Sequence, residues 1–182
     1  MPNISEAKIL IIATDGYEDS ELLEPRRILR ERGAHVTLAS LETGEIEGDN
    51  GATVAVDCTI GEVDAADYGA LVLPGGTKNP DALRMDERVV ATIRAFAAAG
   101  KPVAAICHGP WLLIEADLVR GRRVTGWPSI RTDLRNAGGE VVDEAAVTDG
   151  NIVTSRKPED IPAFTDALIA LYEKAEARLE TA

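Results

Sequence analysis

Two adjacent residues, Cys107 and His108, have the types and the position expected of a nucleophile and its base. The apolar run Val103 to Ile106 predicts a buried strand, and a helical pattern starts at Pro110. Cys107 is therefore expected on a sharp strand-to-helix turn, similar to the nucleophile elbow of Gly-x-Ser-x-Gly enzymes. The amino end of the helix would favour the thiolate, which is the reactive form of cysteine. A buried structural cysteine is the alternative, but the adjacent histidine favours catalysis.

The choice of a general base is narrow because the chain has two histidines. His35 begins a predicted strand, whereas sites in open α/β sheets lie beyond the carboxyl ends of the strands. His108 is therefore the candidate base. No histidine follows it, so the order of nucleophile, acid and late histidine found in α/β-hydrolases is absent. The late histidine that serves the elbow cysteine of glutamine amidotransferases is absent as well.

Two acidic residues follow predicted strands and could reach Cys107. Glu18 is either an acid in the first turn of a helix, stabilised by the helix dipole, or a buried carboxyl that faces the sulfur. Asp81 either caps the next helix or orients the His108 imidazole as the third member of a triad. Spacing favours the capping role for Asp81 and leaves the two interpretations of Glu18 balanced.

Other residues at the same edge could hold a substrate. Gly75 and Gly76 follow a predicted strand, and a turn without side chains lets backbone N–H groups approach a ligand. Together with the N–H of His108, they are a candidate oxyanion hole. Trp127 could line the pocket, although tryptophan more often packs in a core. Arg156 could bind a substrate carboxylate, although a structural role before the last helix is favoured.

Strands and helices alternate along the chain. Buried strands are expected within residues 8–14, 35–40, 68–73 and 103–106, and helices within residues 18–33, 86–99, 110–118, 129–136 and 158–182. A small antiparallel hairpin is expected within residues 44–57, a short strand within 121–127 and a hairpin turn at Asp149 and Gly150. The charged end, residues 173–182, is expected to fray. This order predicts one domain over residues 1–182, an α/β fold built as a three-layer α/β/α sandwich around a mainly parallel sheet.

The composition limits the partners. The chain has 182 residues and a formal net charge of −12, which repels phosphate backbones and argues against nucleic acid. No apolar run is long enough to cross a membrane, and the amino terminus lacks the pattern of a signal peptide. Cys58 and Cys107 lack metal-ligand spacing, so no metal or other cofactor is expected. A disulfide between them is an alternative, but reduced thiols in a cytoplasmic protein are favoured.

The motifs together carry a family resemblance. The chain is similar to the PfpI family of intracellular cysteine proteases, in the superfamily of the parkinsonism-associated protein deglycase, which has a class I glutamine amidotransferase-like fold. The matching stretches cover nearly the whole chain in the family's order and lie at residues 15–21, 71–76, 101–110, 121–125 and 154–158.

The resemblance implies a flavodoxin-like sandwich that forms homodimers, sometimes joined into hexamers. It implies that Cys107 is the nucleophile, His108 its partner and Glu18 a carboxyl hydrogen-bonded to the sulfur. In this family a further acid reaches the histidine from a neighbouring subunit, and its position falls here on Asp81, where the family usually has Glu. Trp127 stands where the family often has Tyr.

The expected activity is that of a stress-protective, cysteine-dependent hydrolase that attacks a peptide or amide carbonyl. Two alternatives use the same residues. One is glyoxalase or deglycase chemistry on reactive aldehydes, in which a carboxyl moves protons beside the cysteine. The other is a chaperone or redox sensor without enzymatic activity, which needs only an oxidisable cysteine.

Overall fold

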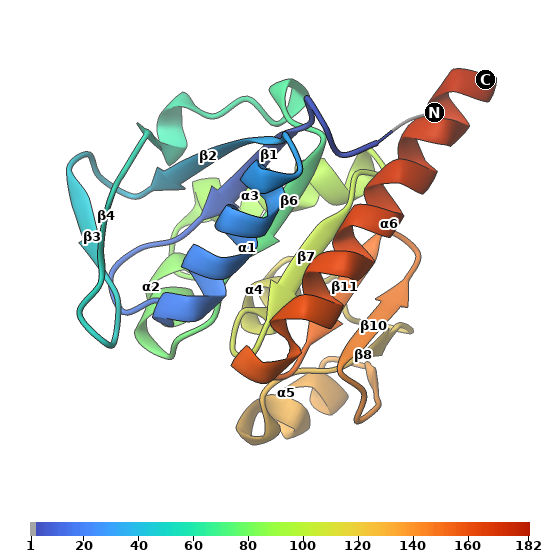
Figure 1. The fold of residues 1–182 in the computed structure, drawn as a ribbon. Helices are drawn as coiled ribbons and strands as arrows, with labels where there is room; N and C mark the ends of the chain where they lie inside the picture. Colours follow the sequence, from blue (N-terminus) through green and yellow to red (C-terminus); the bar gives the residue numbers. More distant parts are fainter. Residues whose placement is uncertain (1–2) are drawn as a thin grey trace.

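A computed structural model describes residues 3–182. Its main sheet has seven strands in the order β10-β11-β7-β6-β1-β2-β5 (Figure 1). Every neighbouring pair in this sheet is parallel except β10 with β11. The strands are β1 (Lys8–Ile12), β2 (His35–Ser40), β3 (Glu45–Glu47), β4 (Thr53–Ala55), β5 (Cys58–Thr59), β6 (Ala70–Leu73), β7 (Val103–Ile106), β8 (Arg123–Val124), β9 (Glu140–Val141), β10 (Ala146–Asp149) and β11 (Ile152–Ser155).

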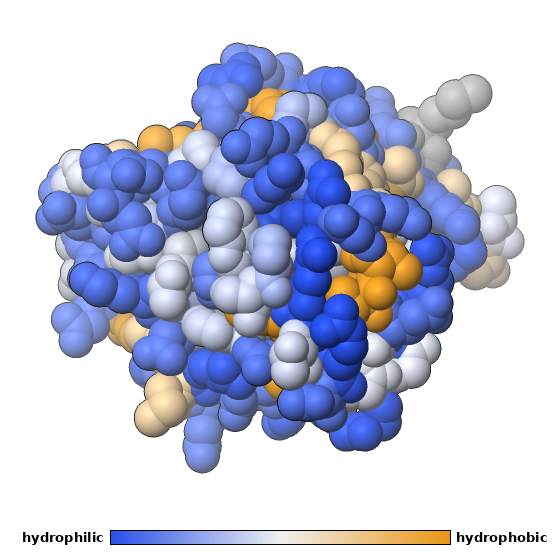
Figure 2. Space-filling model, turned by 90° about the horizontal axis from the view of Figure 1, so that it is seen from below, coloured by the Kyte–Doolittle hydropathy of each residue, from blue (hydrophilic) through white to orange (hydrophobic). Residues whose placement is uncertain are grey.

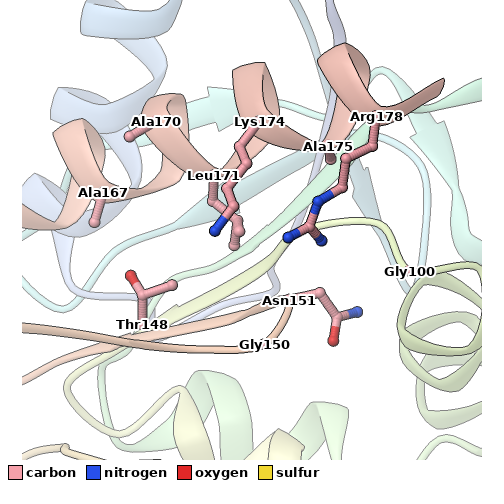
Figure 3. A pocket seen from close by; sticks show the side chains of 10 residues that line it. All are labelled: Gly100, Thr148, Gly150, Asn151, Ala167, Ala170, Leu171, Lys174, Ala175 and Arg178. Atoms are coloured by element: carbon pink, nitrogen blue, oxygen red, sulfur yellow. The ribbon is translucent and has the colours of Figure 1, made fainter. Parts of the chain in front are cut away.

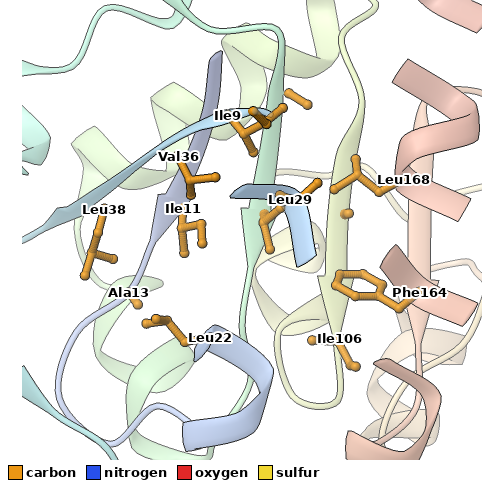
Figure 4. Close-up of a cluster of buried hydrophobic side chains, with 14 of the residues drawn as sticks. Ile9, Ile11, Ala13, Leu22, Leu29, Val36, Leu38, Ile106, Phe164 and Leu168 are labelled. Atoms are coloured by element: carbon orange, nitrogen blue, oxygen red, sulfur yellow. The ribbon is translucent and has the colours of Figure 1, made fainter. Parts of the chain in front are cut away.

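Helices cover both faces of the sheet, which confirms the three-layer α/β/α sandwich. The helices are α1 (Asp19–Glu31), α2 (Lys78–Leu83), α3 (Glu87–Ala98), α4 (Pro110–Glu115), α5 (Arg131–Asn136) and α6 (Ile161–Thr181). On one face, α1 and α6 pack against the sheet through side chains such as Leu22, Leu29 and Phe164 (Figure 4). On the other face, α3 contributes Val89 and Ile93 to a second core cluster.

The central strands are continuous runs of buried side chains because helices cover them on both sides. All four residues of β6 and all four of β7 are fully buried. These strands lie next to each other, with Leu73 in register with Ala105, so the loops that follow them meet at one edge of the sheet. Gly75 and Cys107 are therefore brought together by the topology.

The peripheral elements follow the expected pattern with local differences. The hairpin within residues 44–57 is present as the antiparallel pair β3 and β4, and the β10–β11 turn has Gly150 at φ +60°. The strand expected within 121–127 is only Arg123–Val124 and pairs with β9 in a separate two-stranded sheet. The helix after Cys107 ends at Glu115, before Asp117, whose φ of 54° is left-handed. The last helix runs from Ile161 to Thr181 and so includes the charged end that is expected to fray.

The surface is consistent with the composition. Seen from below in Figure 2, it is mostly hydrophilic, and hydrophobic colour is confined to small areas. Over the described residues, none of the helices combines the length and the apolar character that crossing a bilayer requires.

Candidate active site

Cys107 lies on a strained elbow directly after β7. Its φ is 63°, a left-handed value that is uncommon for a residue with a side chain. The backbone holds it from two sides, because its N–H donates to Ser155 O at 3.0 Å and its C=O accepts from Trp127 N at 2.8 Å. A Cβ on Gly109 would lie 2.9 Å from Ile106 O, so this turn needs glycine there. The predicted elbow is thus present.

The turn after β6 completes one side of the site. Gly76 has a φ of +82°, and the N–H groups of Gly76 and His108 lie near the Cys107 sulfur and lower the pKa of the thiol. These are the two donors expected of an oxyanion hole. The N–H of Gly75 is not available, because it donates to Glu21 Oε2 at 2.8 Å. Gly75 itself allows close contact, since a Cβ there would lie 2.8 Å from Cys107 Cβ.

The carboxyl beside the sulfur belongs to Glu21. This side chain is fully buried and lies beside the Cys107 thiol, close enough that its charge affects the pKa of the thiol. Its other contact is the N–H of Gly75, and within residues 3–182 its Oε1 has no nitrogen or oxygen partner. Oε1 can therefore carry a proton and donate it to the sulfur or to a bound molecule.

The role expected for Glu18 is corrected by this arrangement. Glu18 is the N-cap of α1, and its side chain accepts from the N–H of Glu21 at 3.0 Å and from the Ser20 hydroxyl. It is half-buried and borders the cavity in front of Cys107. The helical period explains the difference, because Glu21 lies one turn further into α1, on the face that packs against the sheet.

Burial keeps the proton on Glu21. Desolvation is the main cause that raises the pKa of Glu21 to about 8, and the negative charge of Glu18 adds to it. A protonated Glu21 carries no charge at neutral pH, which explains how it can lie beside a cysteine in the core.

The resting state of Cys107 differs from the expected thiolate. Burial raises the pKa of the Cys107 thiol, and negative charge on Glu21 would raise this pKa further, whereas the N–H groups of His108 and Gly76 lower it. The short helix α4, with six residues, does not outweigh burial. The sulfur is therefore a thiol until a base removes its proton.

His108 is placed to be that base. Its Nδ1 lies 3.3 Å from Cys107 Sγ, and its Nε2 lies 3.4 Å from Ser129 Oγ. The ring stacks on Trp127 at 5.9 Å between centroids and meets Trp111 edge-on at 5.2 Å. Burial lowers the pKa of His108, so the imidazole is neutral at pH 7 and can accept a proton.

Of the other residues that the sequence suggested for the site, one lines the cavity in front of Cys107 and two do not. Trp127 lines the cavity and is 36% exposed. Asp81 is exposed within α2 and contacts neither histidine nor the next helix cap, which is provided by Asp86. Arg156 is held by Asp160, at 2.8 and 2.9 Å, and by Asp143, at 2.9 Å. Its guanidinium is thus held by carboxylates of the chain itself, which agrees with the structural role and not with binding of a substrate carboxylate.

These groups surround a small cavity of about 200 Å³. Four of its residues were not expected from the sequence: Glu21, Asp49, Thr77 and Pro158. Asp49 and Pro158 come from segments far from Cys107 along the chain. Among residues 3–182, no cluster of histidine, cysteine, aspartate or glutamate has the arrangement of a metal site. The lining residues are Glu18, Glu21, Asp49, Gly76, Thr77, Cys107, His108, Trp127 and Pro158.

A cysteine on an elbow at the carboxyl edge of a parallel sheet, beside a buried carboxyl and a histidine, defines a class of α/β proteins with a candidate thiol active site. Residues 7–171 match the model of the DJ-1/PfpI family. The chain belongs to this family, as its sequence motifs predict. Its fold agrees with DJ-1beta of Drosophila melanogaster, with a TM-score of 0.83 at 28% identity over 97% of this chain and 99% of that one.

Three curated relatives show the range of names in the family. General stress protein 18 of Bacillus subtilis is 47% identical, over 92% of this chain and 98% of its own length. Deglycase PfpI of Pyrococcus furiosus is 44% identical, over 91% and 99%. YraA of Bacillus subtilis, named provisionally as a cysteine protease, is 46% identical, over 86% and 93%.

Proposed function

We propose that this protein is a cysteine-dependent hydrolase whose substrates are small 2-oxoaldehydes and the adducts that they form with amines and thiols. The observation that carries the proposal is the fully buried Glu21 carboxyl beside Cys107, whose pKa burial raises to about 8, in a cavity of about 200 Å³. Ligand cavities for drug-sized molecules are larger, about 300 to 1,000 Å³. A molecule of a few non-hydrogen atoms fits this cavity better than an extended peptide does.

The first step would be addition of the sulfur to the aldehyde carbon. His108 Nδ1, at 3.3 Å, takes the proton from Sγ while the C–S bond forms. The carbonyl electron pair moves onto oxygen, which the N–H groups of Gly76 and His108 would stabilise until it takes the proton of the Glu21 carboxyl. The product of this step is a hemithioacetal.

The second step would use the buried carboxyl. Glu21, now a carboxylate, removes the hydrogen from the former aldehyde carbon while protonated His108 gives its proton to the neighbouring ketone oxygen. As carboxylic acid, Glu21 then returns a proton to the neighbouring carbon, and the hydroxyl proton of the hemithioacetal restores the carboxylic acid. The adjacent ketone becomes a secondary alcohol, and the sulfur-bearing carbon becomes a thioester. Water then cleaves the thioester, which releases a 2-hydroxy acid and regenerates the thiol. A pKa of about 8 allows Glu21 to exchange a proton near neutral pH.

Peptide or amide hydrolysis is the second candidate. It is favoured by the identity with YraA and by the pairing of Cys107 with His108. This reaction needs an imidazole that first takes the thiol proton and then protonates the leaving amine. Within residues 3–182 the recorded partner of His108 Nε2 is the Ser129 hydroxyl, not a carboxylate. We propose that Asp81 of a second subunit supplies the acid, as the family resemblance implies.

A direct comparison of substrates tests the proposal. Methylglyoxal, a methylglyoxal-treated amino acid and a set of peptide amides are offered to wild-type protein and to Cys107→Ala. We expect 2-hydroxy acid from the first two substrates with wild type only. Release of amine from peptide amides, without consumption of methylglyoxal, would select the second candidate instead.

A further inference from the structure

A groove lies at the end of the sheet opposite Cys107, between α6 and the β10–β11 hairpin (Figure 3). Its volume is about 580 Å³, within the range of about 300 to 1,000 Å³ typical of small-molecule sites. Gly100 and Asn151, which line it, lie just before the amino ends of β7 and β11. The groove is therefore separate from the cavity at the carboxyl end of β7.

Small residues leave this space open. Helix α6 presents Ala167, Ala170 and Ala175 to the groove, while Gly100 and Gly150 line it from below. A Cβ on Gly100 would meet no atom within 4 Å. Protein interiors are otherwise densely packed, so an unfilled space with apolar walls is available to a ligand.

Two cations face the groove without carboxylate partners. Lys174 and Arg178 lie four residues apart on α6, on one face of the helix, and their side chains extend over the groove in Figure 3. Neither forms an ion pair within the described part of the chain. Two like charges at this spacing destabilise a helix, and an anion between them would remove that cost.

The side chains that line the groove indicate the chemistry of the uncharged part of the ligand. Leu171 lies in the groove beside Lys174, and Thr148 borders the groove from β10. Asn151 is fixed, because its Nδ2 donates to the carbonyls of residues 97 and 101 at 3.1 and 3.0 Å. Its amide oxygen remains as an acceptor.

From these features we propose that the groove is a binding site for a small organic anion, with an apolar body against α6 and a carboxylate or phosphate between Lys174 and Arg178. A guanidinium binds either head group through two parallel hydrogen bonds. The proposal does not depend on the reaction at Cys107.

The anionic dye 8-anilinonaphthalene-1-sulfonate serves as the probe, because its fluorescence rises in an apolar site. We expect the wild-type chain to bind it and octanoate or octyl phosphate to displace it. Octanol, which has the same apolar body without charge, should displace it at least tenfold less well. Inorganic phosphate, which has no apolar body, should also be weak. The better of the two octyl anions identifies the head group.

Charge variants locate the site. Lys174→Gln with Arg178→Gln should weaken probe binding roughly tenfold or more, because hydrogen bonds to charged groups are lost. The matched control, Arg32→Gln with Arg135→Gln, removes two exposed charges elsewhere and should leave binding unchanged. Cys107→Ala should also bind normally, since the probe is expected outside the catalytic cavity.

Three results would overturn the proposal. Octanol could displace the probe as well as octanoate, which would mean that no anion is recognised. The Lys174 and Arg178 variant could bind as the control does, which would place the probe elsewhere. The same variant could change the oligomeric state by light scattering, which would make the groove an interface between copies of the chain.

Discussion

The proton on Glu21 decides what the buried pair of Glu21 and Cys107 can do. A charged carboxylate in that position would oppose formation of a thiolate, whereas a carboxylic acid can donate to it. Burial raises the pKa of Glu21 to about 8, so the acid form dominates at pH 7. His108 is neutral in the same range because burial lowers its pKa. Proton transfer from Sγ to Nδ1 can therefore begin from three uncharged groups.

The first prediction separates the two glutamates at the start of α1. Glu21→Gln keeps the shape and the hydrogen bonds but cannot exchange a proton, so turnover of methylglyoxal should fall roughly 100- to 10,000-fold. Glu18→Gln preserves an acceptor at the N-cap and should cost less than about tenfold. Initial rates at pH 7 measure both. Equal losses in the two variants would return Glu18 to the role that the sequence suggested.

The second prediction concerns stability and pH. The pKa of Glu21 rises from about 4.5 in the unfolded chain to about 8 in the folded one, so the folded state holds a proton that the unfolded state has released. This group therefore lowers the free energy of unfolding as pH rises from about 5 to 8, by up to about 1.4 kcal/mol per pH unit. Glu21→Gln should lack that slope. Urea unfolding of both proteins at pH 5, 6.5 and 8 measures the slope. If the free energy of unfolding changed with pH by the same amount in wild type and in Glu21→Gln, Glu21 would be charged in the folded state.

Residue spacing in the sequence signals some of the site residues and not others. Cys107 and His108 were identified because the strand, the turn and the helix are adjacent in sequence. The choice between Glu18 and Glu21 depends on the direction in which α1 docks against the sheet, and that direction is set by Leu22 and Leu29 packing into the core. The contact of His108 with Ser129 depends on a loop 21 residues away, which no local pattern reports.

At the scale of elements, two turns position the site. The loop after β6 must pass close to the elbow after β7, and glycine at position 75 makes this approach possible. The Gly75–Glu21 hydrogen bond then links the loop to α1.

The third prediction tests this approach. Gly75→Ala places a Cβ 2.8 Å from Cys107 Cβ and against Glu21, so it should destabilise the fold by about 1 to 3 kcal/mol and displace the catalytic groups. Gly61→Ala is the matched control, because its Cβ would lie 3.7 Å from the nearest atom, in Arg88. Chemical unfolding and turnover are measured for both. A Gly75→Ala protein as stable and active as the control would show that the close contact is unnecessary.

The elements themselves were largely predictable. Continuous apolar runs and the turn residues Asp149 and Gly150 identify the buried strands and one hairpin. The short elements were less predictable, because β8 and β9 have two residues each and exist through their pairing with one another. The end of α4 is set by Asp117 in a left-handed conformation, which its sequence does not signal.

At the scale of the whole molecule, assembly remains a prediction. Asp81 is exposed on α2 and borders a cavity with Trp111, whose ring meets His108 edge-on. A neighbouring subunit docked over this surface could therefore reach the histidine, and the family resemblance implies a homodimer or hexamer. Asp81→Ala should reduce amide hydrolysis roughly 10- to 1,000-fold while the dimer persists.

Subunit mixing gives the control for this fourth prediction. Cys107→Ala and Asp81→Ala proteins are each impaired alone, but a mixed dimer would contain one complete site. Amide hydrolysis should reappear after exchange of subunits is verified by mass spectrometry. Absence of recovery, or a monomer at micromolar concentration with full activity, would place every required acid within one chain.

The central claim is that chemistry at the carboxyl edge of the sheet depends on the Cys107 thiol. The most direct measurement compares methylglyoxal consumption and 2-hydroxy acid formation by wild type, Cys107→Ala and Cys58→Ala. Cys58 is the other free thiol, half-buried in β5. We expect Cys58→Ala to match wild type and Cys107→Ala to lose activity by at least about 1,000-fold, as for other nucleophiles. Activity that survives in Cys107→Ala, or that disappears in Cys58→Ala, would contradict the account.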